Sequence, residues 1–298
     1  MPHTANRLPR EGLILLLSLA LCWGFNWSAM KTVLTELPPL SFRGFCLIFG
    51  GIGVLVIARL NGKPLAIPRG YGAKLFWLVL FNMVGWNVFA TYGVKLMPSG
   101  RAALLGYTMP LWCVPLSVWL LHEALDARRL VALALGLGGV AVLLSQSLTS
   151  LASAPLGVTL MIAAAWCWAT GIVLLKLWKI PMNTVALTGW MMLFGGIPVI
   201  LGAFFIDGLP QKPLSLWPAL GLIYNLLIGF MYCYWAWNRL VLLVPVSVSS
   251  LSSLLTPLVG IASGMIFLGE QPGWHEGIAA LLILGAVGVV SVGSAKRF

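Results

Sequence analysis

Few side chains in this 298-residue chain could act as catalytic or metal-binding groups, and their spacing matches no such site. Both aspartates fall in predicted loops, the five glutamates fall at predicted helix ends, and the three histidines lie near helix ends or in the N-terminal tail. A metal cluster, a Ser-His pair or an aspartate dyad therefore cannot be placed within an apolar segment. Ser263 has no neighbouring base, and a small residue there eases contact between helices. We predict no enzyme activity, no metal site and no cofactor.

Aromatic and amide side chains inside the apolar segments are better suited to binding a small molecule than to transforming it. Arg43 lies about one turn inside an apolar segment, where it could hold a carboxylate through a bidentate contact. For Arg43, the alternatives are that its side chain extends to the outer membrane interface or that it bonds carbonyl groups freed at a helix break. The amides could instead bond neighbouring helices, and some of the rings could face lipid. The predicted substrate-binding residues are Trp23, Asn26, Arg43, Asn87, Tyr107, Trp168, Tyr234, Trp237 and Ser253.

The apolar segments that carry these residues require a membrane. The chain is 60% hydrophobic and 8% charged, with a mean hydropathy of +0.99, whereas a soluble globular chain is about 25% charged. Because so few ionisable side chains cannot cover a water-exposed surface, the sequence predicts an integral membrane protein. The net charge of +11 comes from basic residues in short segments between apolar runs, where they act as topology signals. We therefore predict a lipid environment and no nucleic-acid partner.

Ten apolar segments bounded by proline, asparagine or charge predict an all-α protein with ten transmembrane helices. They cover residues 12–30, 40–59, 74–94, 98–121, 128–147, 155–176, 184–206, 215–238, 245–269 and 275–294. If residues 1–11 form a cytoplasmic tail, 13 basic residues lie inside and 4 outside, with Arg43 left over near the outer end of the second segment, so the positive-inside rule places both termini in the cytoplasm. The outer residues are Lys31, Lys95, Arg101 and Lys212.

The chain also contains an internal repeat. Trp23 aligns with Trp168 at an offset of 145 residues, and Pro98 aligns with Pro245 at an offset of 147. Because a five-helix unit has an odd number of helices, its second copy enters the membrane from the opposite side, and the two repeats have inverted topology. This architecture is typical of secondary transporters, whose substrate site lies near the bilayer midplane between the repeats. The predicted repeats are residues 12–147 and 155–294.

Paired prolines mark the fourth and ninth segments. Pro110 lies 12 residues beyond Pro98, and Pro257 lies equally far beyond Pro245, which is about 18 Å along a helix. A proline inside a helix removes one backbone hydrogen bond and bends the helix. We predict that Pro110 and Pro257 form kinks with a gating role, because interrupted helices at matching positions point to a transport site. The alternative is a purely structural kink.

Together these motifs resemble the EamA unit of the drug/metabolite transporter superfamily. Two copies of the unit cover nearly the whole chain. The residues that carry the resemblance are Cys22-Trp23-Gly24-Phe25-Asn26 and Lys31 in the first segment, Arg43 in the second, and Glu123 and Glu270 after the paired prolines. Within that superfamily, Tyr234-Trp235-Ala236-Trp237-Asn238 is similar to the YddG-type exporters of aromatic amino acids. Many paralogues with other substrates share the same framework.

The resemblance implies alternating-access export of small amphipathic metabolites across a bacterial inner membrane, with aromatic or large apolar amino acids as the first expectation. Since no carboxylate is predicted inside a segment, facilitated diffusion competes with proton-coupled antiport. The alternatives are a transporter of the same superfamily for another amino acid, a drug or a nucleotide-type solute, and a non-transporting sensor or scaffold.

Two further expectations concern packing. Glu123 and Glu270 are expected to stabilise the positive N-terminal end of the helix that follows each of them. Glycines in the fifth and tenth segments permit close backbone contact, which could join the two repeats or form a homodimer face. These glycines are Gly136, Gly138, Gly139, Gly285 and Gly288.

Overall fold

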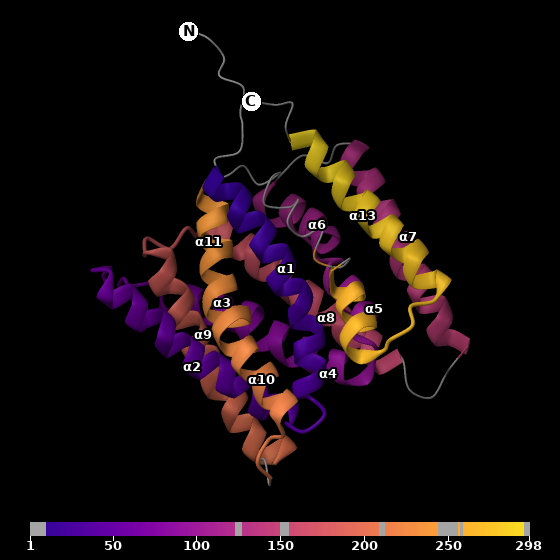
Figure 1. Ribbon diagram of the computed structural model, residues 1–298. Helices are drawn as coiled ribbons and strands as arrows, with labels where there is room; N and C mark the ends of the chain where they lie inside the picture. Colours follow the sequence, from indigo (N-terminus) through magenta and orange to yellow (C-terminus); the bar gives the residue numbers. More distant parts are fainter. Residues whose placement is uncertain are drawn as a thin grey trace.

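The computed structural model describes residues 10–122, 127–149, 155–208, 212–243, 256 and 259–294. Every regular element in these residues is a helix, which confirms the all-helical class, and the helices form one bundle (Figure 1). The first half contains α1 (Arg10–Val33), α2 (Pro39–Leu60), α3 (Gly72–Leu78), η1 (Val79–Gly85), α4 (Trp86–Leu96), α5 (Ser99–Gly106), α6 (Met109–Leu121) and α7 (Ala127–Thr149). The second contains α8 (Pro155–Trp178), α9 (Thr184–Gly202), η2 (Ala203–Asp207), α10 (Leu216–Tyr224), η3 (Asn225–Tyr232), α11 (Cys233–Leu243), a helix over Val259–Leu268 and α13 (Trp274–Ser294).

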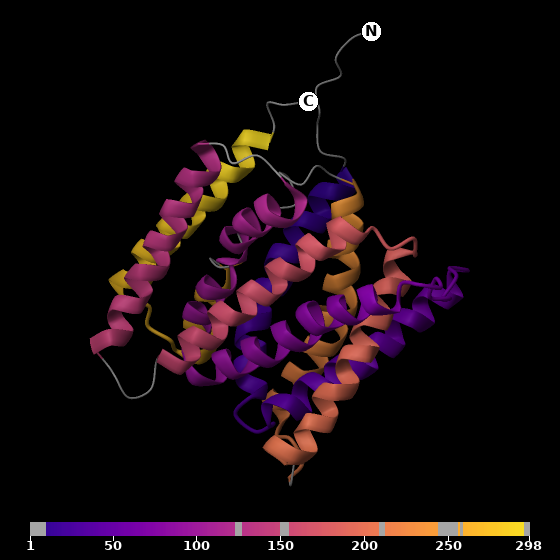
Figure 2. The same cartoon turned by 180° about the vertical axis from the view of Figure 1, so that it is seen from behind.

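Seven of the described helical segments are long and apolar enough to cross a membrane. They are Ile14–Val33, Pro39–Leu60, Gly72–Leu96, Ser99–Leu121, Pro155–Trp178, Thr184–Asp207 and Leu216–Trp237. Three shorter apolar helices, Leu130–Gly139, Val259–Leu268 and Trp274–Ala286, lie within the predicted fifth, ninth and tenth segments. The start of α1 and the end of α13 lie at the same end of the bundle (Figures 1 and 2). Ten spans, inverted topology and cytoplasmic termini stay predictions.

Two of the long segments are divided by a π-helical stretch. η1 joins α3 to α4, and η3 joins α10 to α11. Val79 and Asn225, the first residues of the two stretches, are 146 residues apart, so the stretches occupy the same position in the two predicted repeats. π-Helical turns inside α-helices are frequent at functional sites, because the extra residue in the turn changes the direction of the side chains that follow.

The predicted fourth segment is interrupted. α5 ends at Gly106 and α6 begins at Met109, so Tyr107 and Thr108 lie between two helices. The Thr108 hydroxyl donates to the Leu105 carbonyl over 2.6 Å. Pro110 is the second residue of α6, a position where its missing N–H costs little because the first turn of a helix has no intrahelical acceptors. Pro257 lies outside the described residues, and a gating role for either proline stays a prediction.

Helices of the first half pack against helices of the second in a matching pattern. α2 packs against α9, α1 packs against α10, η3 and α11, and α4 packs against α8. Glycines bring α2 and α9 close together: a Cβ built on Gly51 would lie 2.7 Å from the Leu193 nitrogen and 3.0 Å from the Gly189 oxygen. Small residues at helix interfaces allow this backbone approach in membranes.

The glycine-rich fifth and tenth segments pack against each other, as α7 and α13 (Figures 1 and 2). A Cβ built on Gly139 would lie 2.8 Å from Cγ1 of Ile283 and 3.3 Å from the Ala279 oxygen. For Gly139, the structure therefore favours the interpretation in which the glycine joins the two halves of the chain, whereas a Cβ built on Gly288 would meet nothing within 4 Å.

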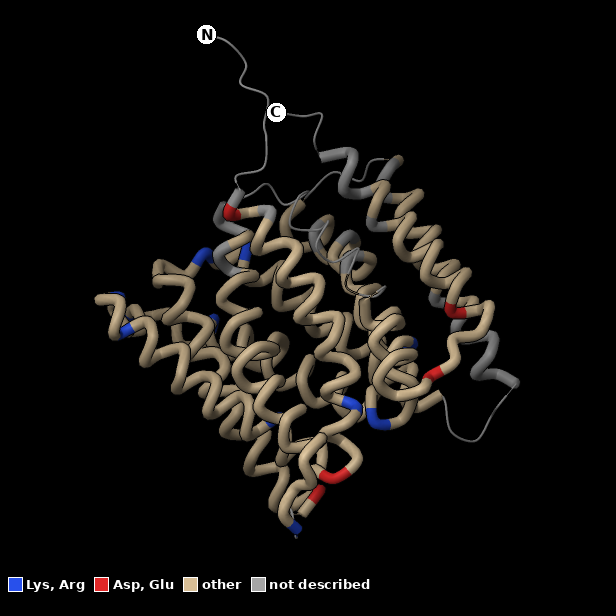
Figure 3. The backbone as a smooth tube through the Cα atoms, in the orientation of Figure 1, with Lys and Arg blue, Asp and Glu red and all other residues tan. Residues whose placement is uncertain are grey.

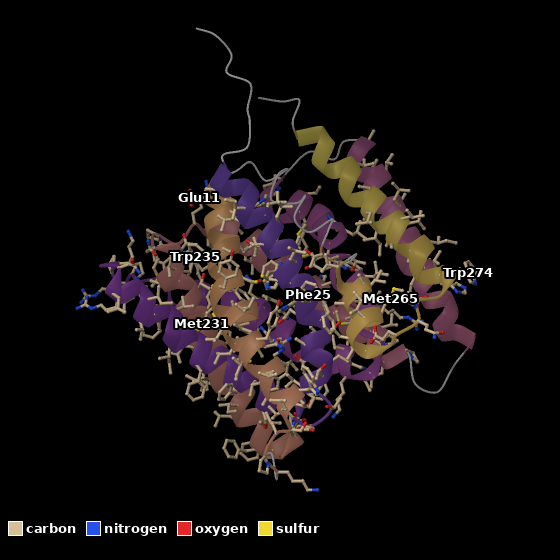
Figure 4. All side chains as sticks on the ribbon, in the orientation of Figure 1. Glu11, Phe25, Met231, Trp235, Met265 and Trp274 are labelled. Carbon is tan, nitrogen blue, oxygen red and sulfur yellow. The ribbon has the colours of Figure 1, made fainter. Side chains whose placement is uncertain are left out.

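The outer surface of the bundle is apolar, as a lipid environment requires. Side chains of Phe25, Trp235, Met265 and Trp274 lie on this surface (Figure 4), and Phe205 is 87% exposed. The charged residues lie mostly at helix ends and connections, and long stretches of the helices carry none (Figure 3). The three-dimensional distribution of charge therefore follows the segments read from the sequence.

Glu270 contacts a different helix from the one expected. It accepts hydrogen bonds from the Ser99 nitrogen over 2.7 Å, the Ser99 hydroxyl over 2.8 Å and the Gly100 nitrogen over 3.3 Å. These donors belong to the first turn of α5, not to α13, which follows Glu270 in the chain. The reason is that Pro98 precedes α5 and has no side chain that could cap it. The expectation that Glu270 stabilises the helix that follows it was therefore wrong, because it caps α5 instead. Glu123 lies outside the described residues.

We expect Glu270→Ala to lower the free energy of unfolding by about 1–3 kcal/mol, because it leaves helix N-terminal donors without an acceptor. The apparent Tm of the detergent-solubilised protein measures this. Glu36 is a matched control, since it accepts from the nitrogen and the hydroxyl of Ser215 in an exposed position. A fall in Tm for Glu36→Ala as large as that for Glu270→Ala would contradict the expectation.

Candidate functional site

A cavity of about 790 Å³, counting the space at its mouth, lies between the two halves of the chain. Its walls come from α1, α2, α4, the break between α5 and α6, α8, η3 and α11. The lining residues are Trp23, Asn26, Trp27, Met30, Arg43, Trp86, Asn87, Ala90, Gly106, Tyr107, Met109, Trp168, Gly229, Phe230, Tyr234, Trp237 and Thr256.

The lining residues repeat along the chain. Asn87 and Tyr234 are 147 residues apart, which is the offset of the predicted repeat. The same offset relates Ala90 to Trp237 and Met109 to Thr256. Both halves therefore contribute equivalent positions to one cavity, which explains why the site lies between them.

One face of α1 forms part of the wall. Trp23, Asn26, Trp27 and Met30 have the spacing i, i+3, i+4 and i+7, which places them on the same side of a helix. The Trp23 indole donates to the Gly229 carbonyl over 3.2 Å, which ties this face of α1 to η3. The periodicity of a single helix is therefore enough to bring four lining side chains together.

Arg43 is buried at the cavity and is 4% exposed. Its Nε donates to the Thr91 hydroxyl over 2.6 Å, and its Nη2 donates to the sulfur of Met30. The guanidinium carbon lies 4.8 Å from the ring centroid of Phe42 and 5.2 Å from that of Phe230. These neighbours are neutral. Because Arg43 is buried, its side chain does not extend to the outer interface, and its acceptors are a hydroxyl and a thioether sulfur rather than backbone carbonyls.

No carboxylate is paired with Arg43 in the described part of the chain. An ion pair elsewhere in that part joins Arg101 to Glu276, with Nη2 and Oε1 2.5 Å apart. A guanidinium without an anionic partner in a site of low polarity favours the binding of an anion, because its charge is otherwise only partly compensated. The lining residues include no aspartate or glutamate, and residues 244–255, beyond the described part, contain none in the sequence.

Glu276 is a buried carboxylate, which its position at a predicted helix end does not indicate. The sequence places it at a helix end, yet the residue is 7% exposed. Arg101 bonds it through Nε over 2.9 Å as well as through Nη2, and the Gly273 nitrogen bonds it over 3.1 Å. Glu276 does not line the cavity. Burial arises because α5 and α13 pack against each other there, which local hydropathy does not reveal.

Aromatic rings form a continuous wall around Tyr234. The ring centroids of Tyr234 and Trp168 are 5.9 Å apart, those of Tyr234 and Trp23 are 6.1 Å apart, and those of Trp168 and Trp86 are 5.0 Å apart. Trp237 extends the wall, 5.7 Å from Trp23. Contacts of this kind stabilise the wall itself and offer ring faces and edges to an apolar or aromatic ligand.

Two polar atoms of the wall have no hydrogen-bond partner among the described residues. They are Oδ1 of Asn26, an acceptor, and Nε1 of Trp168, a donor. Buried polar atoms are almost always bonded, because leaving one unbonded costs about 1–3 kcal/mol. Because both residues line the cavity, a polar molecule bound there is a candidate partner for the two atoms.

The structure brings eight of the nine predicted substrate-binding residues to this cavity. They are Trp23, Asn26, Arg43, Asn87, Tyr107, Trp168, Tyr234 and Trp237, and Ser253 lies outside the described residues. Whether they bind a substrate stays a prediction. Sequence reasoning missed Met30, Phe230 and Thr256 as lining residues. Met30 could have been found, since it lies one turn after Asn26, whereas Phe230 reaches the cavity through the unpredicted π-helical stretch η3.

Comparison with known proteins gives a consistent picture. A sequence profile described as the EamA-like transporter family matches residues 10–145 and again 155–292. The chain is 26% identical to the uncharacterised transporter YoaV of Bacillus subtilis (strain 168), over 91% of each chain. It is 27% identical to a probable amino-acid metabolite efflux pump of Salmonella typhimurium, and 26% identical to a protein of the same description in Escherichia coli (strain K12), over 93% of each chain. A solved crystal structure with 19% identity shares the fold, with a TM-score of 0.69 over 96% of this chain and 98% of that one.

Proposed function

The chain belongs to the EamA-like transporter family, and from that premise we propose that it exports amino acids with aromatic or large apolar side chains. The observation that carries the proposal is the position of Arg43, a buried cation without an anionic partner among the described residues, inside a cavity with aromatic walls. A carboxylate would bond the guanidinium, and an apolar side chain would pack against the rings.

The outward direction and the amino-acid class receive support from the relatives. Two of them, from Salmonella typhimurium and Escherichia coli, are named probable amino-acid metabolite efflux pumps. The multi-pass membrane chain and its bacterial relatives are consistent with a bacterial inner membrane. We propose that both termini face the cytoplasm, as the distribution of basic residues favours. A homodimer stays a prediction, and its face would differ from the contact between α7 and α13.

The proposed mechanism is alternating access with one substrate at a time. The cavity is formed by equivalent positions of the two halves, so movement of one half against the other would expose it to the two sides in turn. No carboxylate lines the cavity in the described residues, so we propose that the substrate moves down its own gradient without a proton relay. Breaks such as the one between α5 and α6 would absorb the change in backbone direction.

The test is transport by the purified protein in liposomes. Labelled tryptophan and phenylalanine are compared with threonine, with and without an imposed pH gradient. We expect saturable flux of the aromatic amino acids, about tenfold or more above that of threonine, that does not depend on the gradient. A gradient requirement would exclude the facilitator mechanism. Flux of a drug or a nucleotide-type solute in place of amino acids would redirect the substrate assignment, and an absence of all flux would favour a sensor or scaffold.

A further inference from the structure

We propose that Asn26 recognises the ammonium group of the substrate, so that the cavity selects amino acids over carboxylates of the same shape that lack the amine. This inference rests on the proposed function and assigns a specificity-determining residue to it. Three features of the described residues carry it: an unbonded acceptor on Asn26, its position one turn from the contact with Arg43, and the neutral character of the residue.

The first feature is the amide oxygen of Asn26. Oδ1 is buried at the cavity without a hydrogen-bond partner among the described residues. Space for the amide exists because residue 229 is glycine, since a Cβ built there would lie 2.5 Å from Oδ1. An N–H donor would satisfy this acceptor, and an ammonium group has three such donors. A plain carboxylate has none to offer.

The second feature is the position of Asn26 relative to Arg43. Met30, whose sulfur accepts from the Arg43 guanidinium, is four residues after Asn26 on α1. Residues at this spacing are about 5–6 Å apart on one face of a helix. An α-amino acid carries its carboxylate and its ammonium on the same carbon, so one molecule with two hydrogen bonds of about 2.8 Å spans such a separation.

The third feature is the neutrality of the acceptor. A carboxylate at position 26, one turn from the guanidinium, would pair with Arg43 and compete with the substrate carboxylate. The neutral amide accepts from an ammonium group without neutralising Arg43. The ring of Trp23, one turn earlier on the same face of α1, offers a π surface to the same cation. The arrangement therefore offers a separate binding group to each charge of a zwitterion: Arg43 to the carboxylate and Asn26 to the ammonium group.

The test measures discrimination between matched ligands. Binding of labelled phenylalanine to the purified protein is competed with phenylalanine, with 3-phenylpropionate, which lacks the amine, and with 2-phenylethylamine, which lacks the carboxylate. We expect the wild type to favour phenylalanine over 3-phenylpropionate by about 10- to 100-fold, the range of a hydrogen bond to a charged group. Asn26→Leu should reduce this ratio to near one while 3-phenylpropionate still competes.

Asn82→Leu is the matched control. Asn82 also has a buried amide oxygen without a partner among the described residues, but it does not line the cavity. Its substitution should leave the ratio unchanged. Because the ratio is measured within each variant, differences in the amount of folded protein do not alter it. Equal weakening of both ligands in Asn26→Leu, or the absence of discrimination in the wild type, would overturn the assignment.

A second variant covers the case in which leucine does not fold. Asn26→Asp has nearly the same shape and adds a negative charge that favours an ammonium group and competes with a ligand carboxylate for Arg43, so the preference for 2-phenylethylamine over 3-phenylpropionate should rise at least tenfold above that of the wild type. An unchanged preference between these two ligands would also overturn the assignment. Transport of phenylalanine in liposomes with an unchanged ratio in the variants would reject the role of Asn26 and leave the proposed function in place. Discrimination in binding without any transport would reject the proposed function instead.

Discussion

Arg43→Met should lower the transport of aromatic amino acids by at least about 30-fold, as expected when one partner of a buried, hydrogen-bonded charge pair is removed. Among the described residues that line the cavity, Arg43 is the only cationic one. Without it, the substrate carboxylate would leave water for a site that offers no opposite charge. Initial rates of labelled tryptophan and phenylalanine flux in liposomes measure the effect.

The same substitution should leave stability unchanged or raise it. A buried guanidinium with no anionic partner costs desolvation energy, and an apolar residue of similar length avoids this cost. Lost transport together with an undiminished Tm would separate a binding role from a structural one. Arg43→Lys keeps the positive charge and loses the planar guanidinium, so its transport rate should lie between those of the wild type and Arg43→Met.

Arg59 provides the control for Arg43, because it lies on the same helix, in the last turn of α2, and is exposed. Arg59→Met should transport at close to the wild-type rate. If Arg43→Met retained most of the transport activity, or if Arg59→Met lost as much as Arg43→Met, the assignment of the carboxylate site to Arg43 would be wrong.

Gly51→Ala should destabilise the bundle by about 1–3 kcal/mol, and Gly51→Leu should prevent recovery of a folded, monodisperse protein. The added Cβ would lie 2.7 Å from the Leu193 nitrogen, which belongs to the backbone of α9 and cannot move aside as a side chain can. The two helices would have to separate along a contact that joins the two halves of the chain. Size-exclusion chromatography and the apparent Tm in detergent measure the effect.

Gly277 is the control for Gly51, since it also lies in a helix and a Cβ built there would meet nothing within 4 Å. Gly277→Ala should be neutral or stabilising by up to about 1 kcal/mol, because alanine favours the helix. Equal losses at Gly51 and Gly277 would show that helix propensity, not the contact between α2 and α9, governs the effect.

Much of the site could be read from the sequence because its signals are local. Trp23 and Asn26 share one face of a helix, and helical spacing is the same in every tertiary context. Trp168 was found as the partner of Trp23 in the internal repeat. Asn87, Tyr234 and Trp237 are polar or aromatic residues inside apolar segments, where such side chains are costly unless they contact a cavity or a neighbouring helix.

Two expectations failed because their outcome depends on partners far along the chain. Glu270 caps α5, about 170 residues earlier in the sequence, and no local pattern distinguishes that helix from the one that follows it. Glu276 is buried because α13 packs near α5 at that point, where Arg101 bonds it. A helix end in the sequence therefore does not specify whether the carboxylate there meets water or another helix.

The sequence by itself determined the membrane class, the positions of the apolar segments and the offset that relates the two halves, because hydropathy and repetition are properties of consecutive residues. Only the tertiary structure decided that Arg43 lies inside the cavity without an anionic partner among the described residues, that the π-helical stretches η1 and η3 occupy matching positions in two long helices, and that Asn26 keeps an unbonded oxygen beside Gly229. These features depend on which helices meet, and that choice is made by the packing of side chains and glycines across the whole bundle.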